Sequence, residues 1–314
     1  MPLPSTPDRL LIVDRDREAL ATWINERRPA LEIRTRDRAE ASQADLDWAD
    51  AYMGFRPPPT LALDGIAWVH CTGAGVDGFL FRRPFPDDTL LTRNDEPFGA
   101  QIGEWCVARA LAVTQQLPGL LDDQHHRRWV PRELAPLRGS RVLVVGAGEV
   151  GRGVAGAFAA LGCTVHGVSR SGGARAPFET VSQVEHLASV VADAEFLVLT
   201  LPLTEATFHL VDGGLLAHCR NAVLMNAGRG ALVDEAAIIP AFQAGHLRAA
   251  ALDVFEQEPL PENSPLWSDP RILISPHVAG LTTVAGAGGS FLQVCSALER
   301  GARPDLAVDT GRGY

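Results

Sequence analysis

The sequence has no long hydrophobic run and only five cysteines. Its longest apolar stretches are no longer than a strand, so we expect no membrane-spanning helix. The N-terminal segment lacks a basic stretch followed by a long apolar one, so no signal peptide is expected. The cysteines are scattered and form no CxxC pair, which is typical of reduced thiols. Together these absences predict a cytoplasmic protein.

Positive charge is also scarce. The chain has 28 basic and 38 acidic residues, a formal net charge of −10, and no basic run. We therefore expect neither a nucleic-acid partner nor a membrane partner. Small anionic substrates remain open, because a local pocket can be positive on an acidic protein. The pair His125-His126 has no third ligand at a suitable spacing, so we expect no metal.

A length of 314 residues predicts two domains. Short apolar runs alternate with helical stretches, which favours parallel strands in an α/β layer fold. In the first hundred residues the pattern predicts a helix at 18–27. It also predicts strands at 10–13, 31–34, 51–55 and 68–70.

A second α/β series follows a predicted helix at 99–117 and a polar arm at 122–129. Six strands with helical crossovers match a complete doubly wound dinucleotide-binding domain. The stretch after His277 is predicted to be helical. The six strands are expected at 141–145, 164–168, 196–200, 222–226, 249–253 and 272–274.

The first strand of this series runs into the turn Gly146-Ala147-Gly148-Glu149-Val150-Gly151. Gly146 permits the tight turn, Gly148 lets the backbone approach a pyrophosphate, and Gly151 lets the following helix pack on the sheet. Glu149 and Val150 open that helix, whose N-terminus suits an anion. The strand before the turn and the helix after it favour a dinucleotide site over a structural glycine turn.

The second strand ends in Ser169-Arg170-Ser171. An NAD site has a carboxylate here for the ribose 2′-hydroxyl, whereas a 2′-phosphate needs a cation. Ser169 replaces the acid, and Arg170 can hold a phosphate through two parallel bonds. We therefore predict that NADP(H) is preferred, with NAD(H) possible. The alternative is a surface arginine beside a tolerant NAD site.

Three further strand ends carry Arg229, an acidic segment at 253–258, and His277. The carboxyl ends of parallel strands meet at one edge of a sheet, where ligands bind. Arg229 could hold the carboxylate and carbonyl oxygens of a substrate, and His277 could donate a proton as hydride arrives. A carboxylate beside the histidine would raise its pKa. The arrangement predicts a carbonyl-reduction site.

Five segments in order carry a family resemblance. They are VVGAGEVG, LPLTEAT, NAGRGALVDE, AALDVFEQEPLP and SPHVAG. They resemble the signature of D-isomer-specific 2-hydroxyacid dehydrogenases, closely over residues 140–280 and loosely elsewhere. Within that family, the segments SRS, NSPLW and GRGY resemble the glyoxylate/hydroxypyruvate reductase A group.

The resemblance implies two doubly wound parallel-sheet domains. A Rossmann cofactor domain at 99–281 would be inserted into a flavodoxin-like substrate domain made of 1–98 and 282–314. The helix and arm at 99–136 resemble the family's dimer contact, which implies a homodimer.

The resemblance also assigns roles to residues. Arg229 matches the catalytic, substrate-binding arginine, His277 the acid/base histidine, and Glu258 the glutamate that pairs with it. Asp253 matches an aspartate near the nicotinamide. Further residues expected at the cofactor are Leu201, Pro202, Thr207 and Ala227.

For the substrate, Ala74, Gly75 and Val76 lie in a loop that resembles the one whose N–H groups hold the carboxylate. Phe55 falls where the reductase A group carries a tryptophan, and Trp267 is expected at the substrate as well. The implied function is an NADPH-dependent reductase of small 2-ketoacids, converting glyoxylate to glycolate and hydroxypyruvate to D-glycerate.

Two alternatives stay open. One is a dehydrogenase for another D-2-hydroxyacid, such as D-lactate or a phosphorylated glycerate. The other is a nucleotide-sensing regulator on the same fold.

Overall fold

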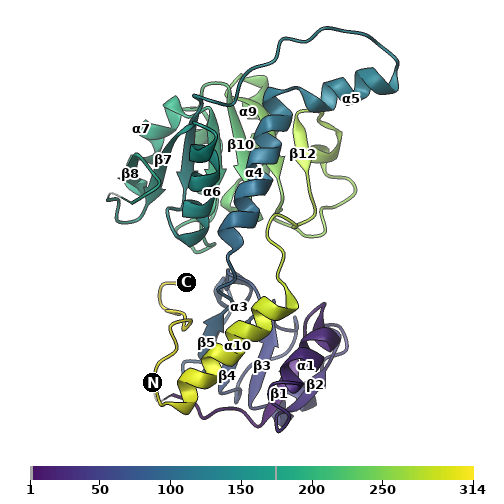
Figure 1. The fold of residues 1–314 in the computed structure, drawn as a ribbon, viewed down its shortest axis with the longest axis vertical. Coiled ribbons are helices and arrows are strands. Elements are labelled where there is room, and N and C mark those ends of the chain that lie inside the picture. Colours follow the sequence, from purple (N-terminus) through teal and green to yellow (C-terminus); the bar gives the residue numbers. More distant parts are fainter. Residues whose placement is uncertain (1–2, 174) are drawn as a thin grey trace. The chain divides into compact units, whose positions relative to one another are not determined.

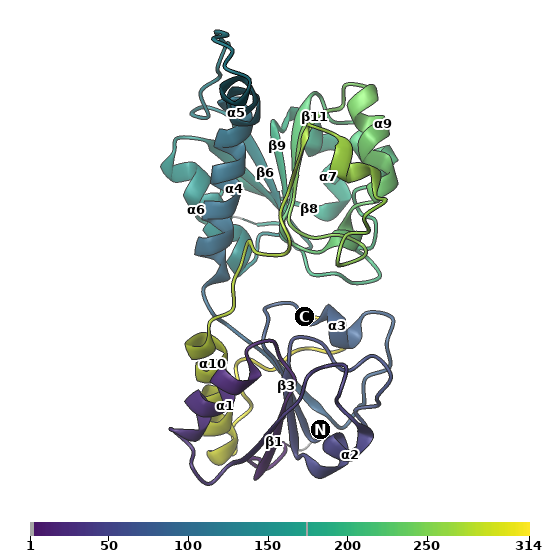
Figure 2. The same ribbon diagram turned by 90° about the vertical axis from the view of Figure 1, so that its right-hand side faces the viewer.

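The computed structural model describes residues 3–173 and 175–314. The chain forms two compact units, one comprising residues up to Glu96 together with Thr282–Tyr314, and the other Pro97–Leu281. Each unit contains one parallel sheet flanked by helices (Figures 1 and 2). Along the chain, the larger unit is therefore inserted into the smaller one.

The sheet of the smaller unit has the order β2-β1-β3-β4-β5, which is flavodoxin-like. Alternate residues of β1 face opposite sides, as the period of a strand requires. Leu10 and Ile12 pack on one face with Phe291, whereas Leu11 packs on the other with Leu46. The strands are β1 Arg9–Ile12, β2 Glu32–Thr35, β3 Ala51–Gly54, β4 Trp68–Cys71 and β5 Leu90–Arg93.

The described residues of this unit form four helices, and α1 and α10 lie side by side on one face of the sheet (Figure 1). The C-terminal helix expected after His277 is thus present as α10. Strand β5 was not predicted, because its sequence LLTR has only two apolar residues and ends in a threonine and an arginine. The helices are α1 Arg17–Asn25, α2 Gln43–Trp48, α3 Asp77–Leu80 and α10 Val284–Glu299.

The larger sheet has seven strands in the order β12-β11-β10-β9-β6-β7-β8, so the prediction of six was wrong by one. The missing strand is β8, an edge strand of sequence TVSQ that buries little side-chain surface and has no apolar alternation. The bounds are β6 Arg141–Val145, β7 Thr164–Ser169, β8 Thr180–Gln183, β9 Phe196–Leu199, β10 Ala222–Asn226, β11 Leu247–Leu252 and β12 Ile272–Ile274.

Helices α4 (Phe98–Thr114) and α6 (Glu149–Ala160) pack closely on one face of this sheet (Figure 1). Glycines make this possible: a Cβ on Gly153 would lie 2.4 Å from the carbonyl carbon of Gly99. The other helices are α5 Leu117–His125, α7 Leu187–Val190, α8 Gly213–Leu216 and α9 Ile238–Gln243. Short 3-10 turns are Val184–His186, Val191–Asp193, Gly230–Leu232, Glu235–Ala237 and Pro265–Ser268.

The helix predicted at 99–117 ends earlier, at Thr114, because Gln116 adopts a left-handed conformation with φ +48°. A new helix, α5, starts at Leu117, and Pro118 in its first turn suits a helix start. The polar arm predicted from residue 122 therefore begins inside α5. Within the described ranges, no helix combines the length and apolar character needed to cross a bilayer.

Candidate active site

The glycine turn lies between β6 and α6. Gly146 has φ +115°, and a Cβ on Gly151 would lie 1.8 Å from its carbonyl oxygen, so neither position can carry a side chain. Gly148 differs, because a Cβ there would meet no atom of the described residues within 4 Å. Nothing in the described part of the fold therefore demands glycine at 148. The open space in front of an α6 N-terminus formed by Glu149 and Val150 fits a pyrophosphate.

The loop after β7 turns back toward this glycine turn. Ser169 Oγ accepts a hydrogen bond from Gly172 N at 3.0 Å, and Gly172 and Gly173 have φ +63° and +95°. The reversal brings Arg175 to the phosphate turn, where Nη1 donates to Ala147 O at 3.5 Å. Arg170 and Ser171 are exposed at the start of this loop.

Arg175 is a candidate that sequence reasoning missed. The available signal was a second arginine six residues beyond the end of β7, in a chain whose 28 basic residues are all arginine. Its approach to the turn depends on two glycines with positive φ, which sequence spacing alone does not show.

Arg229 lies in a tight turn that follows β10. Asn226 Nδ2 donates to Arg229 O at 2.9 Å, while Asn226 Oδ1 accepts from Gly228 N at 3.1 Å. Arg229 Nη1 also donates to Gly228 O at 2.8 Å, and the residue is half-buried. The side chain of Asn226 thus fixes the turn that carries Ala227 and Arg229 at the carboxyl end of the sheet.

His277 follows β12 and adopts a left-handed backbone with φ +53°, which is unfavourable for a residue with a Cβ. Asp253, after β11, holds this conformation. Its Oδ1 accepts from Ser275 Oγ at 2.5 Å and from Val278 N at 3.0 Å, and its Oδ2 accepts from Ala279 N at 2.8 Å. Both oxygens of the carboxylate therefore accept hydrogen bonds from the loop that carries His277. Asp253 is only 1% exposed, so we propose that it acts as a positioning residue.

Glu258 provides the acid beside this histidine. Its Oε2 lies 3.0 Å from His277 Nδ1, and its Oε1 accepts from Phe255 N at 3.2 Å. The other acid of the segment, Glu256, instead lies with Oε1 3.2 Å from His209 Nε2. Glu258 and Glu256 are only two residues apart in the sequence, yet they lie beside different histidines.

The turn after β9 contains Leu201, Pro202 and Thr207. Thr207 Oγ1 donates to Pro202 O and accepts from Thr204 N, both at 2.8 Å. This turn, the glycine turn and the loops after β7, β10, β11 and β12 all follow carboxyl ends of parallel strands in one sheet. The residues expected at the cofactor therefore lie along one sheet edge.

The smaller unit contains the expected carboxylate loop. Ala74 and Gly75 are half-buried, and Val76 is buried at the start of α3. Phe55, after β3, packs directly on this loop, because a Cβ on Gly73 would lie 2.6 Å from its Cε2 atom. Phe55 thus lies against Gly73, the residue that precedes 74–76.

Trp267 belongs to the larger unit and lies on the turn Pro265–Ser268. It is 53% exposed, and its indole N–H donates to Pro261 O at 3.0 Å.

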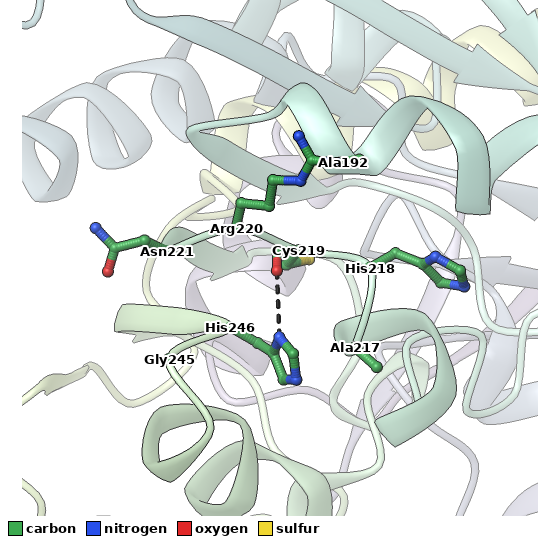
Figure 3. Close-up of a pocket in the computed structure, with 8 residues that line it drawn as sticks. All are labelled: Ala192, Ala217, His218, Cys219, Arg220, Asn221, Gly245 and His246. Carbon is green, nitrogen blue, oxygen red and sulfur yellow. Dashed lines mark hydrogen bonds between the residues drawn. The ribbon is translucent and has the colours of Figure 1, made fainter.

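A separate hollow of about 570 Å³ lies at the amino ends of the strands of the larger sheet, where β10 and β11 begin (Figure 3). His246 Nδ1 donates to Cys219 O there at 3.3 Å, while His218 and Arg220 point in different directions. The hollow is remote from the glycine turn along the strands, and its polar groups do not converge. It is therefore not part of the candidate active site.

The sheet order, the glycine turn and the paired histidine define the class of this protein, a dinucleotide-dependent oxidoreductase. Residues 107–279 match the family "D-isomer specific 2-hydroxyacid dehydrogenase, NAD binding domain". The chain belongs to the D-isomer specific 2-hydroxyacid dehydrogenase family.

Relatives and solved structures agree with this assignment. A glyoxylate/hydroxypyruvate reductase A of Escherichia fergusonii is 32% identical over 93% of this chain and 96% of that protein. A D-isomer specific 2-hydroxyacid dehydrogenase of Xanthobacter autotrophicus Py2, solved with NADPH and MES, has a TM-score of 0.86 and 30% identity, covering 98% of this chain and all of that one. An NADPH-dependent glyoxylate/hydroxypyruvate reductase of Sinorhizobium meliloti, solved with NADP and sulfate, has a TM-score of 0.85 and 25% identity at the same coverage.

Proposed function

We propose that this protein is an NADPH-preferring reductase of small 2-ketoacids, converting glyoxylate to glycolate and hydroxypyruvate to D-glycerate. The observation that carries the proposal is the Glu258–His277 pair at the sheet edge that also presents Arg229 and the glycine turn. The names of relatives such as the Escherichia fergusonii reductase support this substrate class.

The proposed chemistry assigns one task to each group. The guanidinium of Arg229 binds the substrate carboxylate and polarises the carbonyl. When bound, NADPH supplies the hydride that adds to the carbonyl carbon. His277, oriented through Nδ1 by Glu258, passes a proton from Nε2 to the carbonyl oxygen, so C=O becomes CH–OH. His277 then regains a proton from solvent.

The loop after β7 supports the preference for NADPH. Ser169 stands where an NAD site has a carboxylate, and Arg170 and Arg175 both belong to the loop that folds back on the glycine turn. Two guanidinium groups suit a 2′-phosphate. The Xanthobacter and Sinorhizobium proteins were solved with NADPH or NADP, which supports the same preference. NAD(H) would bind more weakly at this site.

An exposed apolar surface in the larger unit supports a homodimer. It is formed by α5 and the following arm, where Trp129 is 97% exposed. Large exposed apolar patches commonly mark protein interfaces, and tryptophan is enriched there. Other exposed apolar residues of this surface are Leu117, Leu121, Val130 and Leu134. All five cysteines are free thiols, which supports a reducing, cytoplasmic location.

The test is a panel of ketoacids with both cofactors. Purified protein should consume NADPH with glyoxylate and hydroxypyruvate at a higher kcat/KM than with pyruvate, phosphohydroxypyruvate or phenylpyruvate. NADH should give a lower kcat/KM with each acid. A preference for a bulky or phosphorylated acid would replace the proposed substrate, and absence of turnover with every acid would favour a nucleotide-sensing regulator.

A further inference from the structure

We propose that Glu235 and Glu256 form a clamp, held by His209, that positions Arg229 relative to the Glu258–His277 pair. The inference rests on the proposed function, since it concerns the same site. It assigns a role to three residues that take no part in the chemistry proposed above.

The clamp is a reciprocal exchange of hydrogen bonds between two loops. Glu256 N donates to Glu235 Oε1 at 2.7 Å, and Glu235 N donates to Glu256 Oε1 at 3.3 Å. Glu235 lies on the loop that begins with Arg229, and Glu256 lies on the loop that supplies Glu258. Both bonds run from a backbone N–H to a carboxylate, so the pair links the two loops reciprocally.

The two loops meet at one point of backbone contact. A Cβ on Gly230 would lie 1.8 Å from the carbonyl carbon of Phe255, so the main chains touch with no room for a side chain. Gly230 adjoins Arg229, and Phe255 N donates to Glu258 Oε1 at 3.2 Å. A shift of this contact would therefore move the guanidinium relative to the carboxylate that orients His277.

His209 ties a third loop to both of the others. Its backbone N donates to Ala231 O at 2.8 Å on the Arg229 loop. Its Nε2 lies 3.2 Å from Glu256 Oε1 on the Glu258 loop, an ion-pair distance for a protonated ring without the geometry of a hydrogen bond. The residue adopts φ +49°, and its ring stacks on Phe208 at 4.0 Å. A histidine held in this strained conformation is consistent with a bridging task.

The electrostatics argue against a purely stabilising role. Burial raises the pKa of Glu235, and the nearby carboxylates of Glu256 and Glu258 raise it further, while the N–H of Glu256 and the His209 ring lower it. Gathering carboxylates at a partly buried site costs free energy. Reciprocal glutamates here are therefore better explained by the geometry that they impose.

The experiment compares alanine and glutamine variants at both positions. Glu235→Ala and Glu256→Ala should lower kcat/KM for hydroxypyruvate by roughly tenfold to a hundredfold, the scale of a misplacement of about 1 Å. Glu235→Gln and Glu256→Gln should stay within about threefold of the parent, since an amide oxygen accepts the same N–H bond. The double alanine variant should be no worse than the single ones, because one missing bond already opens the clamp.

Two controls show whether a loss of kcat/KM comes from the position of Arg229. They exclude a loss of NADPH binding and a general effect of removing an acid from this loop. The Kd for NADPH should not change in any variant, because the phosphate turn follows other strands. Glu262→Ala, an exposed acid further along the same loop, should leave kcat/KM at the parent value. A variant whose Tm falls while its kcat/KM is unchanged would show a stabilising role and overturn the proposal, as would glutamine variants that fall as far as alanine ones.

Hydrogen exchange distinguishes failure of the clamp from failure of the proposed function. Glu256→Ala should accelerate amide exchange in residues 229–237 as well as in its own loop, whether or not the parent reduces ketoacids. An inactive parent with this coupled acceleration would refute the function and keep the clamp. Acceleration confined to residues 253–260 would refute the clamp.

Discussion

Replacing Asp253 by asparagine should loosen the loop that carries His277. The parent carboxylate accepts from Ser275 Oγ and Val278 N through Oδ1 and from Ala279 N through Oδ2. Asparagine has nearly the same shape but a single acceptor oxygen. Its amide N–H₂ must face either the Ala279 N–H or the donors at Oδ1, so at least one backbone donor, buried or part-buried, loses its acceptor.

The magnitude follows from these contacts. A hydrogen bond to a charged group is worth about 1.5–3 kcal/mol, and an unsatisfied buried donor costs about 1–3 kcal/mol. We therefore expect the free energy of unfolding to fall by roughly 2–4 kcal/mol. His277 is held in a left-handed conformation that costs about 1–2 kcal/mol, so a loosened loop should relax away from it. If the loop relaxes by about 1–2 kcal/mol, kcat/KM for hydroxypyruvate should fall by roughly tenfold or more, since about 1.4 kcal/mol corresponds to a factor of ten.

The assay is NADPH consumption with hydroxypyruvate, combined with urea unfolding of the same samples. Asp212→Asn is the matched control, because Asp212 Oδ1 also accepts from a backbone N–H, that of Leu215 at 2.8 Å, but caps α8 instead of the His277 loop. The control keeps its single acceptor oxygen, so both stability and kcat/KM should stay close to those of the parent. Parental kcat/KM in Asp253→Asn would refute the positioning argument.

Three further predictions concern the cofactor, the substrate and acid stability. Arg170→Ala and Arg175→Ala should each raise KM for NADPH by roughly tenfold to a hundredfold and barely change that for NADH; equal effects on both would remove these residues from the 2′-phosphate site. Arg229→Lys should not restore the kcat/KM lost in Arg229→Ala, because ammonium cannot make the two-pronged contact, while the Kd for NADPH should stay unchanged in both. Burial lowers the pKa of His70 to about 3, whereas in the unfolded chain it is about 6.5. The contribution of the neutral His70 to stability should therefore be complete above about pH 6.5, and the free energy of unfolding should fall by about 2 kcal/mol from pH 7 to pH 5. Unfolding of His70→Asn at both pH values should show a smaller fall, and an identical one would contradict this account.

Much of the fold was predictable because a buried parallel strand is a short, nearly continuous apolar run. The strand at 222–226 was predicted with its observed bounds, since all five of its residues are buried. Strands β5 and β8 were missed because their sequences, LLTR and TVSQ, contain only two and one apolar residues and so form no continuous apolar run. The end of α4 was also missed, because it depends on the backbone conformation of Gln116.

The candidate site was predictable where strand ends bring residues to one edge. That rule placed Arg229 and His277 at the same edge as the glycine turn, as the structure has them. It could not choose between Glu256 and Glu258, because two residues in an irregular loop can point in unrelated directions. The carboxylate network of Asp253 and the return of Arg175 also required coordinates, since both depend on contacts between segments distant in sequence.

The central claim is that His277 is the proton donor at an otherwise intact NADPH site. The measurement is kcat for hydroxypyruvate reduction in His277→Asn, together with NADPH affinity by calorimetry. The account predicts a loss of most of the roughly 10²–10⁴-fold that acid–base catalysis supplies, with the Kd for NADPH unchanged. Turnover within a few-fold of the parent would contradict it.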